Sequence, residues 1–249
     1  MRILLTAYDY LVCWVGLIWV GLLLLWSLVA LILHPLLPAG LGRLAIMTVF
    51  RLTLATLALS GRFHFDLRDL DALRKDKSVI IASNHPSLWD VVLIASRLPD
   101  LACIMKAEIL GNIFLAGGAR LARYISNASP RKMVMLAVQE LQRGSHLLLL
   151  PEGTRTVRRP IGPLTASIGV IAYRAQAPVQ TILIETDSPF LNKEWPLFKK
   201  SRLPMHYRVR VGTRFPAPEN GAALMAELTR YFASQLAAPV SPSNSAPAA

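Results

Sequence analysis

Residues 78–90 read Ser-Val-Ile-Ile-Ala-Ser-Asn-His-Pro-Ser-Leu-Trp-Asp, "SVIIASNHPSLWD". The apolar run 78–82 is typical of a buried strand, the Asn and Pro that follow are turn residues, and 88–98 continues as an amphipathic helix. Strand, turn and helix in this order form the repeating unit of a parallel sheet covered by helices. The stretch therefore predicts an α/β fold, and it places His85 and Asp90 at the turn.

The same alternation continues along the chain. Strands are expected at Ser78–Ala82, Leu101–Met105, His146–Leu150, Val179–Glu185 and Tyr207–Gly212. Helices are expected at Leu88–Leu98, at Ala107–Ala122, from Ser129-Pro130 to Gly144, at Leu164–Ala175 and at Ala222–Leu236. The predicted fold class is α/β, with a mostly parallel central sheet flanked by helices and preceded by an N-terminal hydrophobic membrane-anchoring helix or two-helix segment.

The predicted domain organisation has three parts. Residues 1–62 are expected to form membrane-anchoring hydrophobic helices, and residues 63–237 the α/β domain. Residues 238–249, rich in Pro, Ser and Ala, are expected to be a disordered tail.

The composition is apolar and basic at once. Of 249 residues, 53% are hydrophobic and 17% charged, the mean hydropathy is +0.43, and the net charge is +12. This combination favours a membrane surface with anionic headgroups. Nucleic acid is not expected as a partner, because zinc-finger spacing, RNP-type stretches and basic heptad helices are missing from the sequence. The scattered histidines and two cysteines predict neither a metal site nor a disulfide framework, which fits a reducing compartment.

The first apolar segment, Leu11–Leu33, lies within a stretch without charged residues that runs from Tyr10 to Gly42. As a helix it would measure roughly 35 Å, enough to cross a hydrocarbon core of about 30 Å. A cleaved signal peptide is the alternative. The run is too long for a signal-peptide core, however, and Asp9 stands where a cationic segment would be needed.

A second apolar stretch, Leu44–Leu59, is interrupted by Arg51 and flanked by Arg43 and Arg62. This pattern predicts a helix in the membrane interface, with its arginines reaching toward headgroups, or a short second span. The positive charges that follow Leu33 place the downstream domain in the cytoplasm by the positive-inside rule. The expected location is a bacterial-type inner (cytoplasmic) membrane.

The turn at residues 84–90 has two interpretations. Ser87 and Asp90 fit a capping box, in which Asp90 reaches back to the Ser87 N–H and His85 is incidental. Alternatively, Asp90 orients the imidazole of His85 as a general base. On one continuous helix, side chains five residues apart diverge by about 140°, so the second interpretation requires His85 to lie in the turn.

A second stretch, residues 147–155, reads "LLLLPEGTR": an apolar strand followed by a turn with Glu152, Gly153, Thr154 and Arg155. Its glycine permits close backbone approach, and the planar guanidinium suits phosphate. A G-x-S-x-G nucleophile elbow is missing from the sequence. A substrate hydroxyl is therefore the natural nucleophile for a histidine base.

Together, Asn84-His85-Pro86-Ser87-Leu88-Trp89-Asp90 and Pro151-Glu152-Gly153-Thr154-Arg155 resemble the HxxxxD and EGTR motifs of the PlsC-like glycerolipid (lysophospholipid) acyltransferase superfamily. The resemblance covers roughly residues 60–190. It implies an O-acyltransferase, similar to 1-acylglycerol-3-phosphate acyltransferases, that works at a membrane bilayer. Acyl-CoA or acyl carrier protein would be the cosubstrate and a lysophospholipid the acceptor, and no cofactor would be required.

The resemblance also assigns roles to residues. His85 would deprotonate the acceptor hydroxyl, and Asp90 would hold the imidazole. Glu152, Gly153, Thr154 and Arg155 would bind the substrate's phosphate. Lys106, in a K-x-E segment, would be a second phosphate ligand, or else a strand-end lysine in water.

Two departures from the family pattern keep other acceptors open. An arginine expected near Tyr124–Asn127 is missing, and Ala166-Ser167 stands where the family often has Lys-Gly. Both changes remove polar or cationic groups from the headgroup site. The alternatives are an acyltransferase for a different lipid-like acceptor, such as one of a polyketide or aryl polyene pathway, a hydrolase in which His85 activates water, and a non-catalytic lipid-binding relative.

Overall fold

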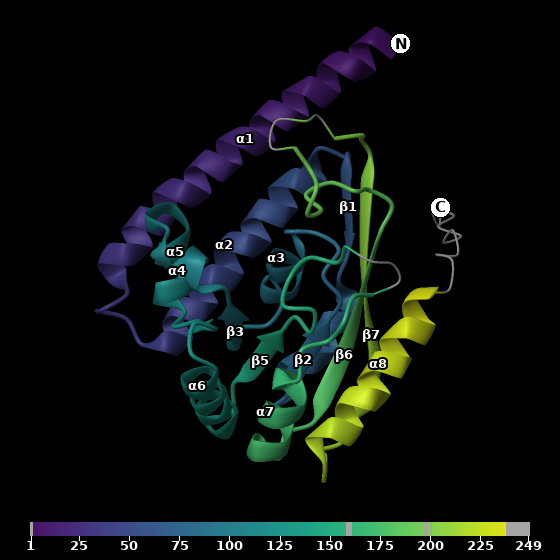
Figure 1. Ribbon diagram of the computed structural model, residues 1–249. Helices are drawn as coiled ribbons and strands as arrows, with labels where there is room; N and C mark the ends of the chain where they lie inside the picture. Colours follow the sequence, from purple (N-terminus) through teal and green to yellow (C-terminus); the bar gives the residue numbers. More distant parts are fainter. Residues whose placement is uncertain (1, 158–160, 197–198, 200, 238–249) are drawn as a thin grey trace.

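The computed structural model describes residues 2–157, 161–196, 199 and 201–237 (Figure 1). These residues form one seven-stranded sheet with the strand order β1-β7-β6-β2-β5-β3-β4. The strands are β1 (Phe63–Asp66), β2 (Ile80–Ser83), β3 (Leu101–Met105), β4 (Ile125–Ser126), β5 (His146–Leu149), β6 (Val179–Thr186) and β7 (Met205–Phe215). The β6–β7 pair is antiparallel and the other pairs are parallel, which confirms the predicted fold class.

Helices cover both faces of the sheet and precede it. They are α1 (Arg2–Leu33), α2 (Ala39–Leu59), the 3-10 helix η1 (Arg68–Lys75), α3 (Asp90–Ala95), α4 (Ala107–Gly111), α5 (Ile113–Leu121), α6 (Pro130–Gln142), α7 (Ser167–Ala175) and α8 (Gly221–Ala237). The helix expected at Ala107–Ala122 is thus two helices, α4 and α5, because residue Asn112 has an extended backbone between them. The tail predicted at 238–249 lies outside the described residues.

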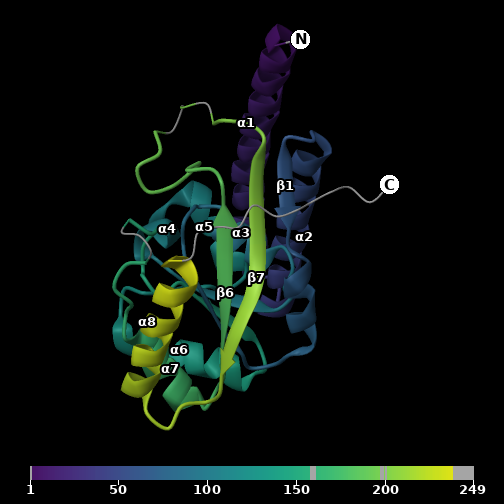
Figure 2. The same ribbon diagram turned by 90° about the vertical axis from the view of Figure 1, so that its right-hand side faces the viewer.

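Two hydrophobic cores lie on opposite faces of the sheet. One contains side chains of α1, α2, η1 and α3, and the other contains side chains of α6, α7 and α8. Figure 2 shows the two sides, with α2 and α8 separated by the sheet. Strand β2 contributes side chains to both cores, because Ile81 lies in the first core and Ile80 and Ala82 lie in the second. A strand buried on both faces has an apolar sequence throughout, which is why the run 78–82 could be identified.

The helices α1 and α2 are each long and apolar enough to cross a membrane. Most side chains of α1 are exposed, and the helix packs along α5, where the Gly117 N–H donates to the Ser27 hydroxyl at 3.0 Å. A Cβ on Gly117 would lie 1.7 Å from the Ser27 carbonyl oxygen, so only glycine permits this approach.

The expected orientation of two arginines at α2 is wrong. The Arg43 side chain is only 3% exposed and forms ion pairs of 2.7 Å with Asp100 and Glu140, instead of reaching toward headgroups. Arg62 pairs with Asp9 of α1 at 2.7 Å and also donates to the Leu203 carbonyl. Both partners of Arg43 lie more than fifty positions away in the chain, so the local pattern could not reveal them.

Candidate functional site

The two motif-bearing turns lie at the same edge of the sheet. Strands β2 and β5 are parallel neighbours, with Ala82 opposite Leu149, and each ends just before its turn. In α/β folds, ligands bind beyond the carboxyl ends of the strands. The fold therefore brings the His85 turn and the Arg155 turn to the edge where a site is expected.

His85 and Asp90 are in direct contact. The imidazole Nδ1–H donates to Asp90 Oδ2 at 2.8 Å, with the Asp90 side chain fully buried and that of His85 12% exposed. The same Oδ2 accepts the Ser87 N–H at 2.8 Å. The two interpretations of this turn are thus compatible, because one carboxylate oxygen both holds the imidazole and accepts the backbone N–H before α3.

Burial dominates the electrostatics of this pair. It raises the pKa of the Asp90 carboxyl, while the hydrogen bonds from His85 and the Ser87 N–H and the charge of Arg155 act in the opposite direction. A carboxylate with little access to water interacts strongly with a positive charge that forms beside it. The arrangement thus suits an imidazole that gains a proton at Nε2 while Nδ1 stays bound to Asp90.

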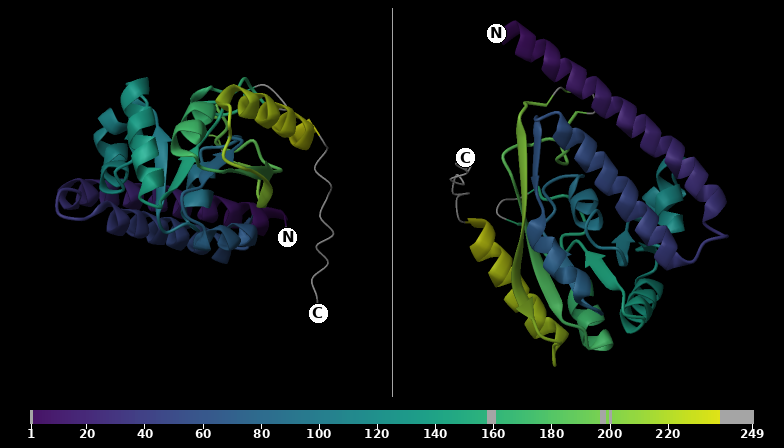
Figure 3. Two further views of the ribbon diagram at one scale, coloured as in Figure 1. Left: turned by 90° about the horizontal axis from the view of Figure 1, so that it is seen from below. Right: turned by 180° about the vertical axis from the view of Figure 1, so that it is seen from behind.

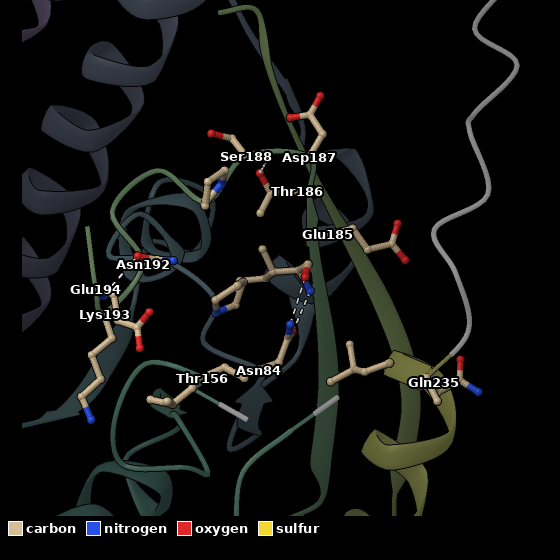
Figure 4. A pocket seen from close by; sticks show the side chains of 16 residues that line it. Asn84, Thr156, Glu185, Thr186, Asp187, Ser188, Asn192, Lys193, Glu194 and Gln235 are labelled. Atoms are coloured by element: carbon tan, nitrogen blue, oxygen red, sulfur yellow. Dashed lines mark hydrogen bonds between the residues drawn. The ribbon is translucent and has the colours of Figure 1, made fainter. Parts of the chain in front are cut away.

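The backbone around His85 is held by neighbouring segments. Asn84 forms two hydrogen bonds with the backbone of Ile184 at the end of β6 (Figure 4). The His85 carbonyl accepts the Thr156 N–H at 2.7 Å, which joins the two motif-bearing turns directly. The turn that carries His85 is therefore fixed from both sides.

The segment 188–192 supports the other half of the turn. The Ser87 hydroxyl donates to the Phe190 carbonyl at 3.0 Å, and the Leu88 N–H donates to the Leu191 carbonyl at 3.1 Å. Arg155 Nη1 donates to the same Leu191 carbonyl at 3.0 Å and to that of Asn192 at 2.7 Å. Arg155 thus ties this segment to its own turn.

Glu152 and its neighbours shape a loop. Glu152 accepts the Gly162 N–H at 2.8 Å and the hydroxyl of Thr156. Gly153 has a φ of +63°, which favours glycine, and Thr154 is half-buried. The carboxylate is therefore occupied within the protein, and Arg155 is the cation of this motif near the His85–Asp90 pair.

Lys106 lies at the same edge but apart from this cluster. It precedes α4 at the carboxyl end of β3, and its side chain is exposed. Within the described ranges, no hydrogen bond or ion pair connects it to His85, Asp90 or Arg155.

A cavity of about 820 Å³ opens beside the His85 turn (Figure 4). Its walls are the residues on either side of His85, residues Thr156 and Val157, the stretches Ile184–Pro189 and Asn192–Glu194, and the end of α8. A volume of this size is typical of small-molecule sites.

Several positions that hold the site were not predicted. Asn84 and Ser87 belong to the quoted motif, but their residue types indicate only a turn and a helix cap. The contact of Thr156 with His85, and those of the segment 188–192 with Ser87 and Arg155, use backbone groups of these positions, which carry no chemical signal in the sequence.

Comparisons with known proteins identify acyltransferases as relatives of this chain. The family model described as Acyltransferase matches residues 64–185. The 1-acyl-sn-glycerol-3-phosphate acyltransferase of Pseudomonas aeruginosa is 23% identical over 229 residues, which cover 87% of this chain and 86% of that protein. The beta form of the human 1-acyl-sn-glycerol-3-phosphate acyltransferase is 27% identical over 142 residues, which cover 54% of this chain and about half (51%) of the human protein.

The fold also matches a solved structure. The 1-acyl-sn-glycerophosphate acyltransferase PlsC of Thermotoga maritima superposes with a TM-score of 0.63 at 17% identity, and the match covers 94% of both chains. At this identity the match concerns the fold.

Proposed function

Because this chain belongs to the acyltransferase family and is an O-acyltransferase, we propose that it acylates a hydroxyl of 1-acylglycerol 3-phosphate or a similar lysophospholipid. The acyl donor would be a thioester of coenzyme A or of acyl carrier protein. The observation that carries the proposal is the 2.8 Å contact between His85 and a fully buried Asp90 at the carboxyl edge of the sheet. The names of the relatives supply the acceptor class.

The proposed chemistry needs one base. His85 Nε2 takes the proton of the acceptor hydroxyl, and the oxygen attacks the thioester carbonyl carbon. The tetrahedral intermediate collapses, the carbon–sulfur bond breaks, and the imidazolium returns the proton to the sulfur. The products are an ester and a free thiol, and Asp90 stabilises the imidazolium throughout.

The membrane would supply the lipid acceptor. The long apolar helix α1 is exposed along most of its length and is the natural anchor. The cations after Leu33 favour a catalytic domain in the cytoplasm, at the inner membrane of a bacterial-type cell. Arg155, near the His85–Asp90 pair, is our candidate ligand for the acceptor's phosphate.

One observation favours a second acceptor class. Position 166 is an exposed alanine, and the neighbouring Ser167 hydroxyl contacts Thr165 at 2.9 Å, so neither residue offers a cation to a headgroup. A lipid-like acceptor without a phosphate is therefore the second candidate.

The test uses the full-length chain in nanodiscs with acyl-CoA or acyl carrier protein thioesters. The acceptors are 1-acylglycerol 3-phosphate, other lysophospholipids and an uncharged monoacylglycerol. Thiol release and the lipid products, identified by mass spectrometry, are measured together. The proposal expects phosphatidate and a loss of about 10²–10⁴-fold in the variant His85→Ala.

The matched control is His64→Ala, which removes an exposed histidine of β1. Product from the monoacylglycerol alone would select the second acceptor class. Free fatty acid without acylated lipid would indicate hydrolysis. Equal thiol release by the parent and by His85→Ala would rule out the proposed base.

A further inference from the structure

Tyr207 brings a buried hydroxyl to the edge of the sheet that carries the site. Strand β7 lies between β1 and β6 and runs antiparallel to β6 (Figure 3). Its first residues therefore lie at the carboxyl end of β6, where Tyr207 is paired with Thr186. Met205, Tyr207 and Val209 are buried and the residues between them are exposed, so the period of the strand turns Tyr207 into the core.

Packing alone does not explain a tyrosine at this position. Tyr207 is only 1% exposed, and its ring stacks on that of Phe65 with 5.9 Å between the centroids, a contact that phenylalanine would make equally well. Burying a hydroxyl costs free energy unless the hydroxyl is hydrogen-bonded. Within the described residues, no partner meets full hydrogen-bond geometry with Tyr207 Oη. The hydroxyl is thus a buried polar group whose partners have to be identified.

Two other hydroxyls lie close to that of Tyr207. Burial raises the pKa of Tyr207 to about 12, while the nearby hydroxyls of Ser87 and Thr186 act in the opposite direction. The Thr186 hydroxyl accepts a backbone N–H at 3.2 Å (Figure 4) and keeps its own hydrogen for donation. The Ser87 hydroxyl donates to the Phe190 carbonyl and accepts the Trp89 N–H, which leaves it one further lone pair. Tyr207 can therefore accept from Thr186 and donate to Ser87.

The Asp90 carboxylate is held through one of its two oxygens. Oδ2 accepts both the His85 Nδ1–H and the Ser87 N–H at 2.8 Å, whereas Oδ1 is buried without a hydrogen-bond partner in the described part of the chain. The orientation of the carboxylate therefore depends on the two donors at Oδ2. Ser87 supplies one of them, so a contact that fixes Ser87 also fixes the angle at which Asp90 meets the imidazole.

We propose that Tyr207 is a positioning residue of the His85–Asp90 pair. Its hydroxyl accepts from Thr186 and donates to Ser87 Oγ, so a chain of three hydroxyls runs from the end of β6 to the turn. Hydrogen bonds that follow one another in such a chain strengthen one another. The chain fixes Ser87 and, through the Ser87 N–H, the carboxylate that holds the imidazole. The kinetic part of this inference rests on the proposed function, whereas the geometry of the pair can be measured without turnover.

The kinetic test is the variant Tyr207→Phe, which removes the hydroxyl and keeps the ring. The kcat of acyl transfer should fall about 3–10-fold, as expected for the loss of one hydrogen bond that orients the base. The KM values for donor and acceptor should stay within about twofold, because the buried Tyr207 meets neither substrate. In the background of Asp90→Asn, the same change should alter kcat by less than about twofold, since Tyr207 acts through the carboxylate. Equal losses in both backgrounds would overturn the inference.

The matched control is Tyr231→Phe, which removes a tyrosine hydroxyl with a structural contact. Tyr231 packs against the core on the opposite face of the sheet, and its hydroxyl accepts the Thr213 N–H at 3.0 Å. Both variants should lower the unfolding temperature, but only Tyr207→Phe should lower kcat. The same loss of kcat in Tyr231→Phe would show that any lost tyrosine hydroxyl has this effect, and would overturn the inference.

A spectroscopic measurement separates this inference from the proposed function. A histidine Nδ1 proton that is bound to a carboxylate gives a far-downfield NMR signal, which is assigned here by its loss in His85→Ala. The signal should move upfield in Tyr207→Phe and not in Tyr231→Phe, because a carboxylate that is less well fixed accepts a weaker hydrogen bond. This shift is expected whether or not a lipid is acylated. If Tyr207→Phe fails to fold, Thr186→Val, which interrupts the same chain, takes its place with the same direction of shift. An unchanged signal would overturn the inference.

Discussion

Asn84 and Ile184 lie 100 positions apart in the chain and are joined by two hydrogen bonds. The Asn84 side chain donates to the Ile184 carbonyl at 2.9 Å and accepts the Ile184 N–H at 2.8 Å. The amide thus acts as one more rung between β2 and β6, beyond the end of the backbone ladder and one residue before His85. The position of the candidate base depends on this rung.

Replacing Asn84 with Ala should lower both stability and activity. The variant leaves two buried backbone groups of Ile184 without partners, which costs about 1–3 kcal/mol in the free energy of unfolding. Urea unfolding in detergent measures this loss. Asn84→Asp keeps the acceptor but turns a carboxylate oxygen toward the Ile184 carbonyl in a buried site, so it should be destabilised at least as much as Asn84→Ala. An Asn84→Asp variant as stable as the parent would contradict the proposed rung.

Asp90→Asn separates the two uses of this side chain. The amide oxygen can still accept the Ser87 N–H, so the start of α3 should survive and the unfolding temperature should stay close to that of the parent. The uncharged amide no longer stabilises an imidazolium, so kcat should fall about 10²–10⁴-fold. Full activity in a folded variant would show that the contact is only structural.

Arg43→Leu should be destabilising. It would remove the 2.7 Å partner of the largely buried Glu140, which keeps Arg143 as its other cation, and of the half-exposed Asp100, at a cost of about 1–3 kcal/mol. The comparison is Arg51→Leu, an exposed position of the same helix, where a change within about 0.5 kcal/mol is expected. Chemical unfolding of both variants in the same detergent tests the difference, and similar losses would contradict it.

His146 should make stability depend on pH. Burial lowers the pKa of this imidazole, whose Nε2 donates to the Leu73 carbonyl at 3.0 Å. Below about pH 6.5 the unfolded chain binds a proton that the folded chain does not, so the free energy of unfolding falls as the pH decreases. The variant His146→Gln has no imidazole at this position, so its unfolded chain does not bind this proton. The parent should therefore lose more stability than His146→Gln between pH 7.5 and 5.5, and parallel losses would exclude the effect.

The central strands could be predicted because both of their faces are buried. Strand β3 has the predicted bounds. The ends of β2, β5 and β6 lie within two residues of the predicted ends. β1 and β4 were not predicted, because four and two residues carry too little pattern. Their pairing with β7 and β3 comes from tertiary contacts, which no local window contains.

The contacts of the candidate site likewise fall into local ones, which the sequence predicts, and long-range ones, which it does not. The contact between His85 and Asp90 could be predicted because both residues belong to one turn. The carbonyl partners of Arg155 lie 36 and 37 positions away, and Glu152 binds within a loop whose course no motif describes. These contacts could be identified only in the folded structure, because every residue has a backbone carbonyl and N–H and the residue type does not reveal which of them takes part.

Ion pairs at the start of α2 and just after its end join the apolar helices to one another and to the sheet domain. An anchor on a flexible linker would let an active site sample many tilts above a bilayer. Here Arg43 fixes one end of α2 to the domain, and Arg62 fixes the other to Asp9 of α1. An apolar helix longer than the local hydrocarbon layer adjusts by tilting. In the proposed membrane-bound state, bilayer thickness would then set the angle at which His85 meets the lipid surface, and so influence which acceptors reach it.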